Sequence, residues 1–269
     1  MNLETLASRI GQFTVPNADD GEMFLETARL ELIRESLAAS AYHPLADLPL
    51  SKIYKHAEFR GSRPLILLSC HIDSIYKIYH TSRCGGELLG NYDNSACNAL
   101  LVEAMLHNLL PPQALVAFTG DEEDEGRGAD QTIGILRQEN LFARVEMVIV
   151  LDLTEEHYRS HSHTIENIFV RKDRSGSLLK FASKRDLEHY LSASVASPAF
   201  VNHAAPDEAW QYHKHDLNCF SLCLPCRVLG ADMHDDPGVA ITEDSILAYV
   251  QTLARLTESV ARDLKDRQI

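Results

Sequence analysis

Several residues that could bind a metal ion directly follow apolar segments of this chain. His71 follows PLILLSC, Glu122 and Glu123 come just after ALVAFTG, Asp152 follows VEMVIVL, and His234 comes a few residues after FSLCLPCRVL. Such segments have the character of buried strands, and ligands bind at the carboxyl ends of the strands in open α/β sheets. Imidazole nitrogen and carboxylate oxygen are ligands of zinc. The pattern therefore predicts a metal-dependent hydrolase.

Two more carboxylates are placed to join this site. Asp73 lies two residues beyond His71, so both side chains face the same way if the strand continues. Asp73 could then accept the second ring N–H of His71. Asp93 precedes a segment with apolar residues at helical spacing, which puts it at the positive end of an expected helix. A single His-x-Asp pair is more often an ordinary surface or core pair. The His71–Asp73 pair therefore supports a metal site only in combination with the other potential ligands.

The five acidic residues at positions 121–125 form a run that would by default be a solvated, self-repelling surface. This run directly follows a strand-like segment, so we expect its backbone to be anchored at the sheet edge. Two adjacent carboxylates can divide the work at a metal, one as a ligand and the other as the acceptor of a proton from water. Asp152 ends a strongly apolar segment and therefore needs a partner or a metal, with a helix cap as the alternative.

Five sequence blocks resemble, in the same order, those of the dizinc exopeptidases, which include leucine-type and glutamyl aminopeptidases, glutamate carboxypeptidases and aminoacylases. The blocks are CHIDS, GNYDNSACNALLVEA, FTGDEEDEGRGA, VLDLT and DMHDDP. The resemblance implies two zinc sites that share one carboxylate. The implied ligands are His71, Asp93 and Asp152 for one ion, and Asp93, Glu123 and His234 for the other. It also implies that Glu122 is the general base and that Asp73 is the partner of His71.

The chain departs from the family pattern at two places. Cys97 stands where the family usually has a glycine, and additional acids displace the glycine expected after the glutamate pair. The base and ligand roles could therefore fall to Glu122 with Glu123 or to Glu123 with Asp124. An ungapped match through Arg127-Gly128-Ala129 favours the first pair. Co²⁺ or Mn²⁺ could replace Zn²⁺, because histidine and carboxylate ligands serve all three metals.

The order of expected elements predicts an α/β fold. Strands at 65–70, 114–119 and 145–151 alternate with helices that begin near residue 95 and span about 129–138. This alternation is typical of a largely parallel sheet between helices. We expect three layers, αβα, around a mixed, largely parallel sheet, as in zinc-dependent exopeptidases and phosphorylase/hydrolase-like folds. A long helix capped by Thr242 to Ser245 should follow at the C-terminus.

The remaining segments give weaker signals. We expect a helix from Asp19 and Asp20 to Leu37, a strand at SKIYKHAEF, and a polar surface loop from Thr81 to Gly90. A strand at Ile168 to Arg171 and a helix around Leu178 to Leu191 are also expected. The pairs His161/His163, His213/His215 and Cys223/Cys226 are more typical of local hydrogen bonding and structural thiols than of ligands.

The spacing of the motifs predicts one catalytic domain, residues 1–269, without an inserted lid or dimerisation domain. Only 22 positions separate His71 from Asp93, and 82 separate Asp152 from His234. Family members with carboxypeptidase or aminoacylase activity carry their carboxylate-binding arginine in the insert that is missing here. The resemblance therefore implies an aminopeptidase that uses a water shared by two metal ions. The alternatives are a deacylase, amidohydrolase or carboxypeptidase acting on small N-acylated amino acids, and a non-catalytic metal-binding protein.

The composition of the chain limits the classes of substrate and binding partner that we expect. The net charge of −14 opposes binding to phosphate backbones, so we expect a peptide or small amide substrate and no nucleic acid. No stretch reaches the roughly 18 to 20 apolar residues that span a bilayer, so no membrane partner is expected. The N-terminal residues lack the basic start and apolar core of a secretory signal, which predicts a cytoplasmic protein with its six cysteines as free thiols. A homo-oligomer remains open.

Overall fold

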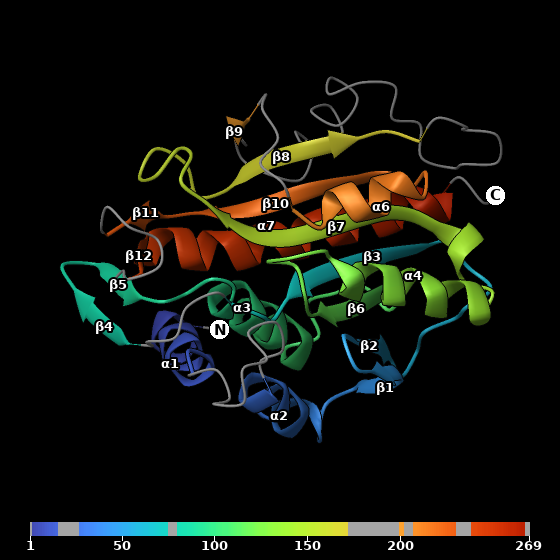
Figure 1. Ribbon diagram of the computed structural model, residues 1–269, viewed down its shortest axis with the longest axis horizontal. Helices are drawn as coiled ribbons and strands as arrows, with labels where there is room; N and C mark the ends of the chain where they lie inside the picture. The colour runs from blue at the N-terminus through green and yellow to red at the C-terminus, as the bar shows by residue number, and fades with distance from the viewer. Residues whose placement is uncertain are drawn as a thin grey trace.

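A computed structural model describes residues 2–15, 27–74, 80–171, 199–201, 207–229 and 238–266. Its main sheet has eight strands in the order β1-β2-β6-β3-β7-β10-β8-β9 (Figure 1). The strands are β1 (Tyr42–Leu48), β2 (Ser51–His56), β3 (Leu65–His71), β6 (Ala114–Thr119), β7 (Val145–Thr154), β8 (Thr164–Phe169), β9 (Ala199–Phe200) and β10 (Cys219–Pro225).

The centre of this sheet is parallel. β3 pairs in parallel with both β6 and β7, and β10 pairs in parallel with β7. Antiparallel pairs lie outside this centre, where β1 pairs with β2, β2 with β6, and β8 with β10. The mixed, largely parallel sheet expected from the alternating pattern is confirmed.

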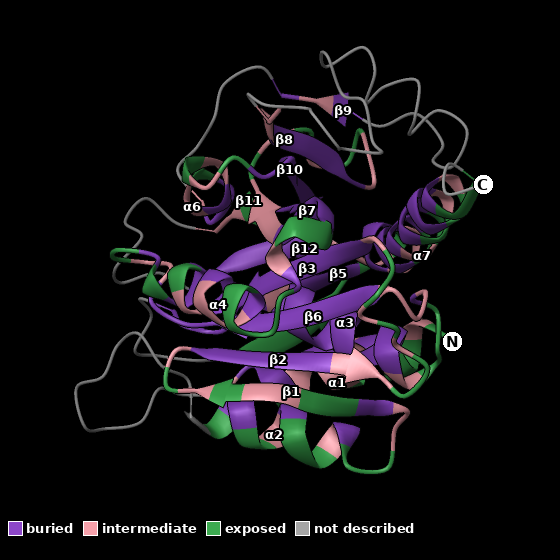
Figure 2. Ribbon diagram, turned by 90° about the vertical axis from the view of Figure 1, so that its right-hand side faces the viewer, coloured by how far each residue is buried: buried purple, intermediate pink, exposed green. Residues whose placement is uncertain are grey.

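Helices cover both faces of the sheet, as Figure 2 shows for α4 and α6 on one side and α3 and α7 on the other. The helices are α1 (Leu3–Phe13), α2 (Thr27–Leu37), α3 (Ser95–Leu106), α4 (Arg127–Gln138), α6 (Ala209–Lys214) and α7 (Glu243–Asp266), and a short 3₁₀ helix, η1 (Phe142–Arg144), precedes β7. Alternate residues of β3 enter opposite cores: Ile66 and Leu68 pack with α1, α2, α3 and α7, whereas Leu65 and Leu67 pack with α4 and α6. The three-layer, single-domain architecture is therefore confirmed.

The C-terminal helix begins where the sequence indicates. The backbone N–H of Ser245 donates to Thr242 Oγ1 at 3.2 Å, which caps α7. Ile246, Val250 and Leu253 on its inner face are fully buried. This long helix therefore adds one continuous apolar stripe to the core that also contains α3.

A second, smaller sheet has the order β11-β12-β5-β4 and contains β4 (Thr81–Cys84), β5 (Glu87–Gly90), β11 (Arg227–Val228) and β12 (Val239–Thr242). The prediction of a surface loop from Thr81 to Gly90 is therefore wrong. Gly85 and Gly86 have φ values of 61° and 81° and form the turn of a β4–β5 hairpin. The four residues of β4 are all exposed, so their sequence shows no alternation from which a strand could be predicted.

Other boundaries differ from the expectations. β2 ends at His56 rather than at Phe59, and β8 spans Thr164–Phe169 rather than the later segment that ends at Arg171. Asp19, Asp20 and the expected helix at 178–191 lie outside the described residues. All six cysteines are free, as expected. Within the described ranges, no helix combines the length and the apolar character needed to cross a membrane.

Candidate metal centre

The expected site residues gather where three neighbouring strands end. β6, β3 and β7 lie side by side and run parallel, so their carboxyl ends share one edge of the sheet. His71 is the last residue of β3 and pairs in register with Thr119, the last residue of β6. Glu122 and Glu123 follow β6 after a short turn, and Asp152 lies near the end of β7. The position matches the general rule for ligand sites in such sheets.

The His71 ring is surrounded by carboxylates. Its Nε2 lies 3.3 Å from Asp93 Oδ1 and 3.4 Å from Asp152 Oδ1. Ligand atoms of these three residues all lie within 4.8 Å of one another, and the same is true of His71 with Glu122 and Glu123. One imidazole therefore borders two groups of potential ligand atoms.

Asp73 lies on the other side of this ring. Its Oδ1 is 3.5 Å from His71 Nδ1, which is longer than a good hydrogen bond. Its Oδ2 accepts the backbone N–H of Glu123 at 3.2 Å. Asp73 thus contacts the last residue of β3 and the loop after β6, and helps to hold them together.

Two asparagines fix the start of α3 against the same strand ends. Asn98 Nδ2 donates to the backbone oxygen of His71 at 2.7 Å, and Asn94 Nδ2 donates to the backbone oxygen of Leu151 at 2.7 Å. Asn98 Nδ2 also donates to Asn94 O at 2.7 Å. Asp93 immediately precedes Asn94, so these bonds place its carboxylate between β3 and β7. Their spacing of four residues in GNYDNSACN was a signal that the sequence reasoning did not use.

The centre concentrates negative charge in a buried place. Burial, reinforced by neighbouring carboxylates, raises the pKa of Glu122 to about 10 and of Glu123 to about 8. Burial likewise raises the pKa of Asp152. Burial opposes protonation of His71, but the carboxylates around it, Glu122 first among them, outweigh this effect and hold its pKa well above the usual value.

The donor set fits a metal cation. Asp93 Oδ1 and Glu123 Oε1 are shielded from water and receive no hydrogen bond. Buried carboxylate oxygens are costly unless they are paired or coordinate a metal. One imidazole and several carboxylates are ligands that suit zinc in catalytic sites. A divalent cation would supply the positive charge that this cluster needs.

Six of the seven expected site residues are therefore brought together: His71, Asp73, Asp93, Glu122, Glu123 and Asp152. Asp124 is exposed, so the two acids that approach His71 are Glu122 and Glu123.

His234 lies outside the described residues, in segment 230–237. The described residues on either side of this segment are close to the centre. The backbone N–H of Leu229 donates to Gly238 O at 2.9 Å, and Val239 pairs with Gly90 in the β12–β5 ladder. Gly90 is three residues before Asp93.

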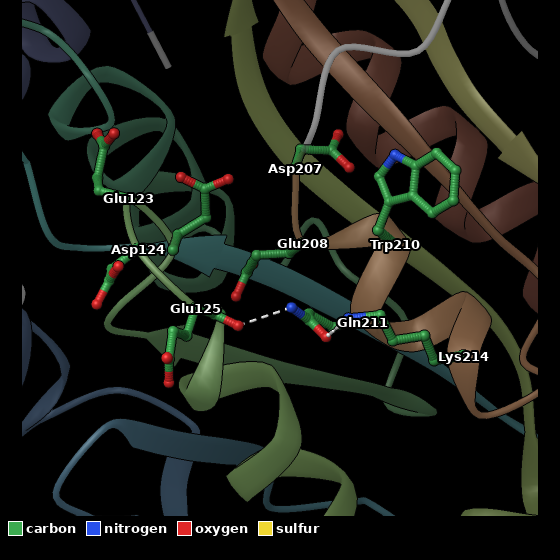
Figure 3. A pocket seen from close by; sticks show the side chains of 10 residues that line it. Glu123, Asp124, Glu125, Asp207, Glu208, Trp210, Gln211 and Lys214 are labelled. Carbon is green, nitrogen blue, oxygen red and sulfur yellow. Dashed lines mark hydrogen bonds between the residues drawn. The ribbon is translucent and has the colours of Figure 1, made fainter.

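A cavity of about 530 Å³ adjoins the centre (Figure 3). It lies between the loop that follows β6 and helix α6, and it is lined by Glu122, Glu123, Asp124, Glu125, Gly126, Asp207, Glu208, Trp210, Gln211 and Lys214. Glu208 was missed by the sequence reasoning. It is 1% exposed, and burial raises its pKa to about 7. The only sequence signal was an acidic pair in a polar segment before a six-residue helix, and such pairs are usually solvated.

No protein-family model and no curated protein sequence matches the chain. Solved structures do match it. Aminopeptidase PepT from Bacillus cereus has 11% sequence identity and a TM-score of 0.68, with 97% of this chain and 99% of that chain covered. Aminopeptidase APDkam598 from the archaeon Desulfurococcus kamchatkensis has 9% identity and a TM-score of 0.70, with 95% of each chain covered. The chain has the fold of these two aminopeptidases.

A third structure, PhTET1-12s, is a dodecamer in the asymmetric unit. It has 12% identity and a TM-score of 0.64, with 93% of this chain and 98% of that chain covered. The TM-scores show that the fold is shared, and at identities this low the reaction must be argued from the site itself. The fold expected from the five sequence blocks is confirmed.

Proposed function

We propose that the protein is a dinuclear zinc aminopeptidase that hydrolyses the N-terminal peptide bond of peptides. The observation that carries this proposal is the meeting of His71, Asp93, Asp152 and the Glu122–Glu123 pair at one sheet edge. Buried carboxylate oxygens without hydrogen bonds support a role in cation binding. The fold that the chain shares with two aminopeptidases also favours this chemistry.

In this proposal, His71, Asp93 and Asp152 would hold one zinc ion. Asp93, Glu123 and His234 would hold the second. Bound zinc would acidify a water molecule and polarise the carbonyl of the scissile bond. Asp73 and Asn98 support the site by holding His71, from its ring and its backbone oxygen respectively.

Glu122 is the general base and acid of the proposed reaction. Its side chain lies beside His71 but is not needed to complete either ligand set, so it is free to accept a proton from the attacking water. It can then return that proton to the leaving amine.

The acidic lining of the cavity favours a substrate with a free amine. The N-acylated amino acids of the alternative hypothesis carry only a negative charge, and they would meet Asp124, Glu125 and Glu208. Like charges in a partly buried site repel. An aminopeptidase substrate instead presents a positive amine.

The test combines metal analysis with a substrate panel. Purified protein is analysed for zinc, cobalt and manganese, then assayed on leucyl, lysyl and glutamyl anilides and on N-acetylated amino acids, before and after chelation. We expect hydrolysis of free-amine substrates, loss on chelation and recovery with added zinc. Hydrolysis of only the N-acetylated compounds would establish the deacylase instead. Bound metal without any hydrolysis would favour a non-catalytic protein.

A further inference from the structure

The cavity beside the metal centre contains acidic residues that have no role in the proposed cleavage of the peptide bond. Glu122 and Glu123 have roles at the centre, which leaves Asp124, Glu125, Asp207 and Glu208 among its lining residues. The one cation that lines it, Lys214, donates its Nζ to Gln211 Oε1 at 2.8 Å (Figure 3). Glu125 Oε2 also lies 3.8 Å from Arg127 Nε. The lining keeps a net negative charge when the charge of Lys214 and this ion pair are counted.

Glu208 lacks a partner on one of its oxygens. Its Oε2 accepts a hydrogen bond from Ser69 Oγ at 2.9 Å, and the Thr119 side chain also interacts with the carboxylate. Its Oε1 is shielded from water and accepts no hydrogen bond of good geometry. Figure 3 shows this side chain extending from the start of α6 toward the loop on the other side of the cavity. An unpaired buried carboxylate is costly, and burial accordingly raises the pKa of Glu208 to about 7.

Asp207 differs from Glu208 because both of its oxygens are satisfied. Its Oδ1 accepts the backbone N–H of Ala209 at 2.8 Å, and its Oδ2 accepts bonds from Asn167 Nδ2 at 2.6 Å and from Ser221 Oγ. Asp207 thus serves the fold at the beginning of α6. Of the buried acids in this lining that have no role at the metal centre, Glu208 is the one with an oxygen that lacks a hydrogen bond.

Trp210 gives the cavity an apolar wall. Its side chain is 42% exposed, although its ring packs against Phe169 with the ring centroids 4.9 Å apart. An exposed indole beside carboxylates suits a group with an aliphatic stem and a positive end, because the ring contacts the stem and its face attracts the charge.

We propose that this cavity binds the cationic side chain of a lysine or arginine residue of the substrate, with Glu208 as its charge partner and Trp210 against its stem. This inference rests on the proposed function, since it names the substrate class of the same site. An aliphatic side chain would leave Glu208 Oε1 unpaired. An acidic side chain would be repelled by the lining.

The test compares kcat/KM for lysyl, arginyl, leucyl and glutamyl anilides. We expect the zinc-loaded wild-type protein to prefer the lysyl and arginyl substrates. In Glu208→Gln, which keeps the shape and an acceptor for Ser69, the ratio of lysyl to leucyl kcat/KM should fall about tenfold, mainly through a higher KM for the lysyl substrate. Trp210→Ala, at an exposed position, should lower the same ratio severalfold. Asp244→Asn, an exposed acid in the first turn of α7, is the matched control and should leave it unchanged.

A wild-type preference for leucyl or glutamyl substrates would overturn the inference, as would an unchanged ratio in both cavity variants. Calorimetric binding of L-lysinamide and L-leucinamide to the zinc-loaded protein separates this result from failure of the proposed function. If no anilide is hydrolysed, the proposed reaction fails. Tighter binding of lysinamide that is lost in Glu208→Gln would still support the cavity assignment, and equal binding of both amides would contradict it.

Discussion

Glu122 and Glu123 are adjacent in the loop after β6 but have different surroundings, and we propose different roles for them. Glu123 has a buried oxygen without a hydrogen bond, and its backbone N–H is held by Asp73. Glu122 reaches the same imidazole from the neighbouring position. A metal ligand must stay on the metal, whereas a general base must exchange a proton. We therefore expect substitution of Glu122 and substitution of Glu123 to have different effects.

Glu122→Gln should abolish turnover and leave metal binding intact. Removal of a general acid or base commonly lowers kcat by about 10² to 10⁴. Metal content, measured on the same preparation as kcat, should stay at the wild-type value because glutamine preserves the shape of the loop. Near-normal kcat in this variant would show that the base has been misassigned.

His163 makes the stability of the folded protein depend on pH. Burial, helped by the charge on His161, lowers its pKa to about 4. Between about pH 6.5 and 4 the unfolded chain therefore binds a proton that the folded chain does not, so stability is lost as the pH falls through this range. The loss attributable to this residue is at most roughly 3 kcal/mol.

Urea unfolding of the wild-type protein and of His163→Leu at several pH values measures this effect. The difference in unfolding free energy between the two proteins should shift in favour of the variant as the pH drops from 7 to 4, because other titrating groups are common to both. Parallel curves over that range would mean that His163 is not held neutral by the fold.

At the scale of residues, the sequence correctly predicted the potential metal ligands that directly follow strand-like segments. The spacing of His71 and Asp73 and the position of the glutamate pair each pointed to the centre, and the structure brings these residues together. Glu208 could not be found in this way. Its burial arises from packing between α6 and β3, where Ser69 and Tyr212 meet, and no local pattern encodes such a contact.

At the scale of elements, the small sheet links the described part of the centre to the segment that holds His234. Gly238 has a φ of 95°, and a Cβ atom added there would lie 2.2 Å from the backbone oxygen of Gly90. Only glycine allows β12 to pass this close to β5. The β11–β12 hairpin, which flanks segment 230–237, therefore depends on this position.

Gly238→Ala should destabilise the protein by about 1 to 3 kcal/mol and weaken metal binding. Gly134→Ala in α4 is the matched control, because no atom lies within 4 Å of its added Cβ and helical alanine is favoured over glycine. Thermal melting and zinc titration of both variants check the prediction. A Gly238→Ala protein that melts and binds zinc as the wild type does would rule out this role for the hairpin.

The elements that were predicted correctly have a strong apolar pattern in their own sequence. β3, β6 and β7 contain continuous apolar runs that are buried, and α7 has an apolar stripe at helical spacing. The β4–β5 hairpin was not predicted, because its strands are four residues long and β5 pairs on its other side with β12, far away in sequence. Non-local pairing of that kind leaves no local signal.

Across the whole molecule, the clustered carboxylates would make the stability of the fold depend on the proposed metal ions. Without a cation, several buried acids repel one another at the end of the central strands. A ligand that binds only the folded state stabilises it by mass action. Chelation should therefore lower the melting temperature by several degrees, and zinc should restore it.

His71→Asn is the control for this effect, since it removes the imidazole that both groups of ligands share. Its melting temperature should be insensitive to chelator and to added zinc in a differential scanning measurement. A wild-type protein that melts at the same temperature with and without chelator would show that metal binding contributes nothing to folding.

The most direct test of the central claim is anomalous diffraction at the zinc edge from crystals of the zinc-loaded protein. The account predicts two anomalous peaks about 3.5 to 4 Å apart on either side of the Asp93 carboxylate, one of them against His71 and Asp152. Zinc peaks elsewhere, or none at Asp93 in zinc-saturated crystals, would contradict it.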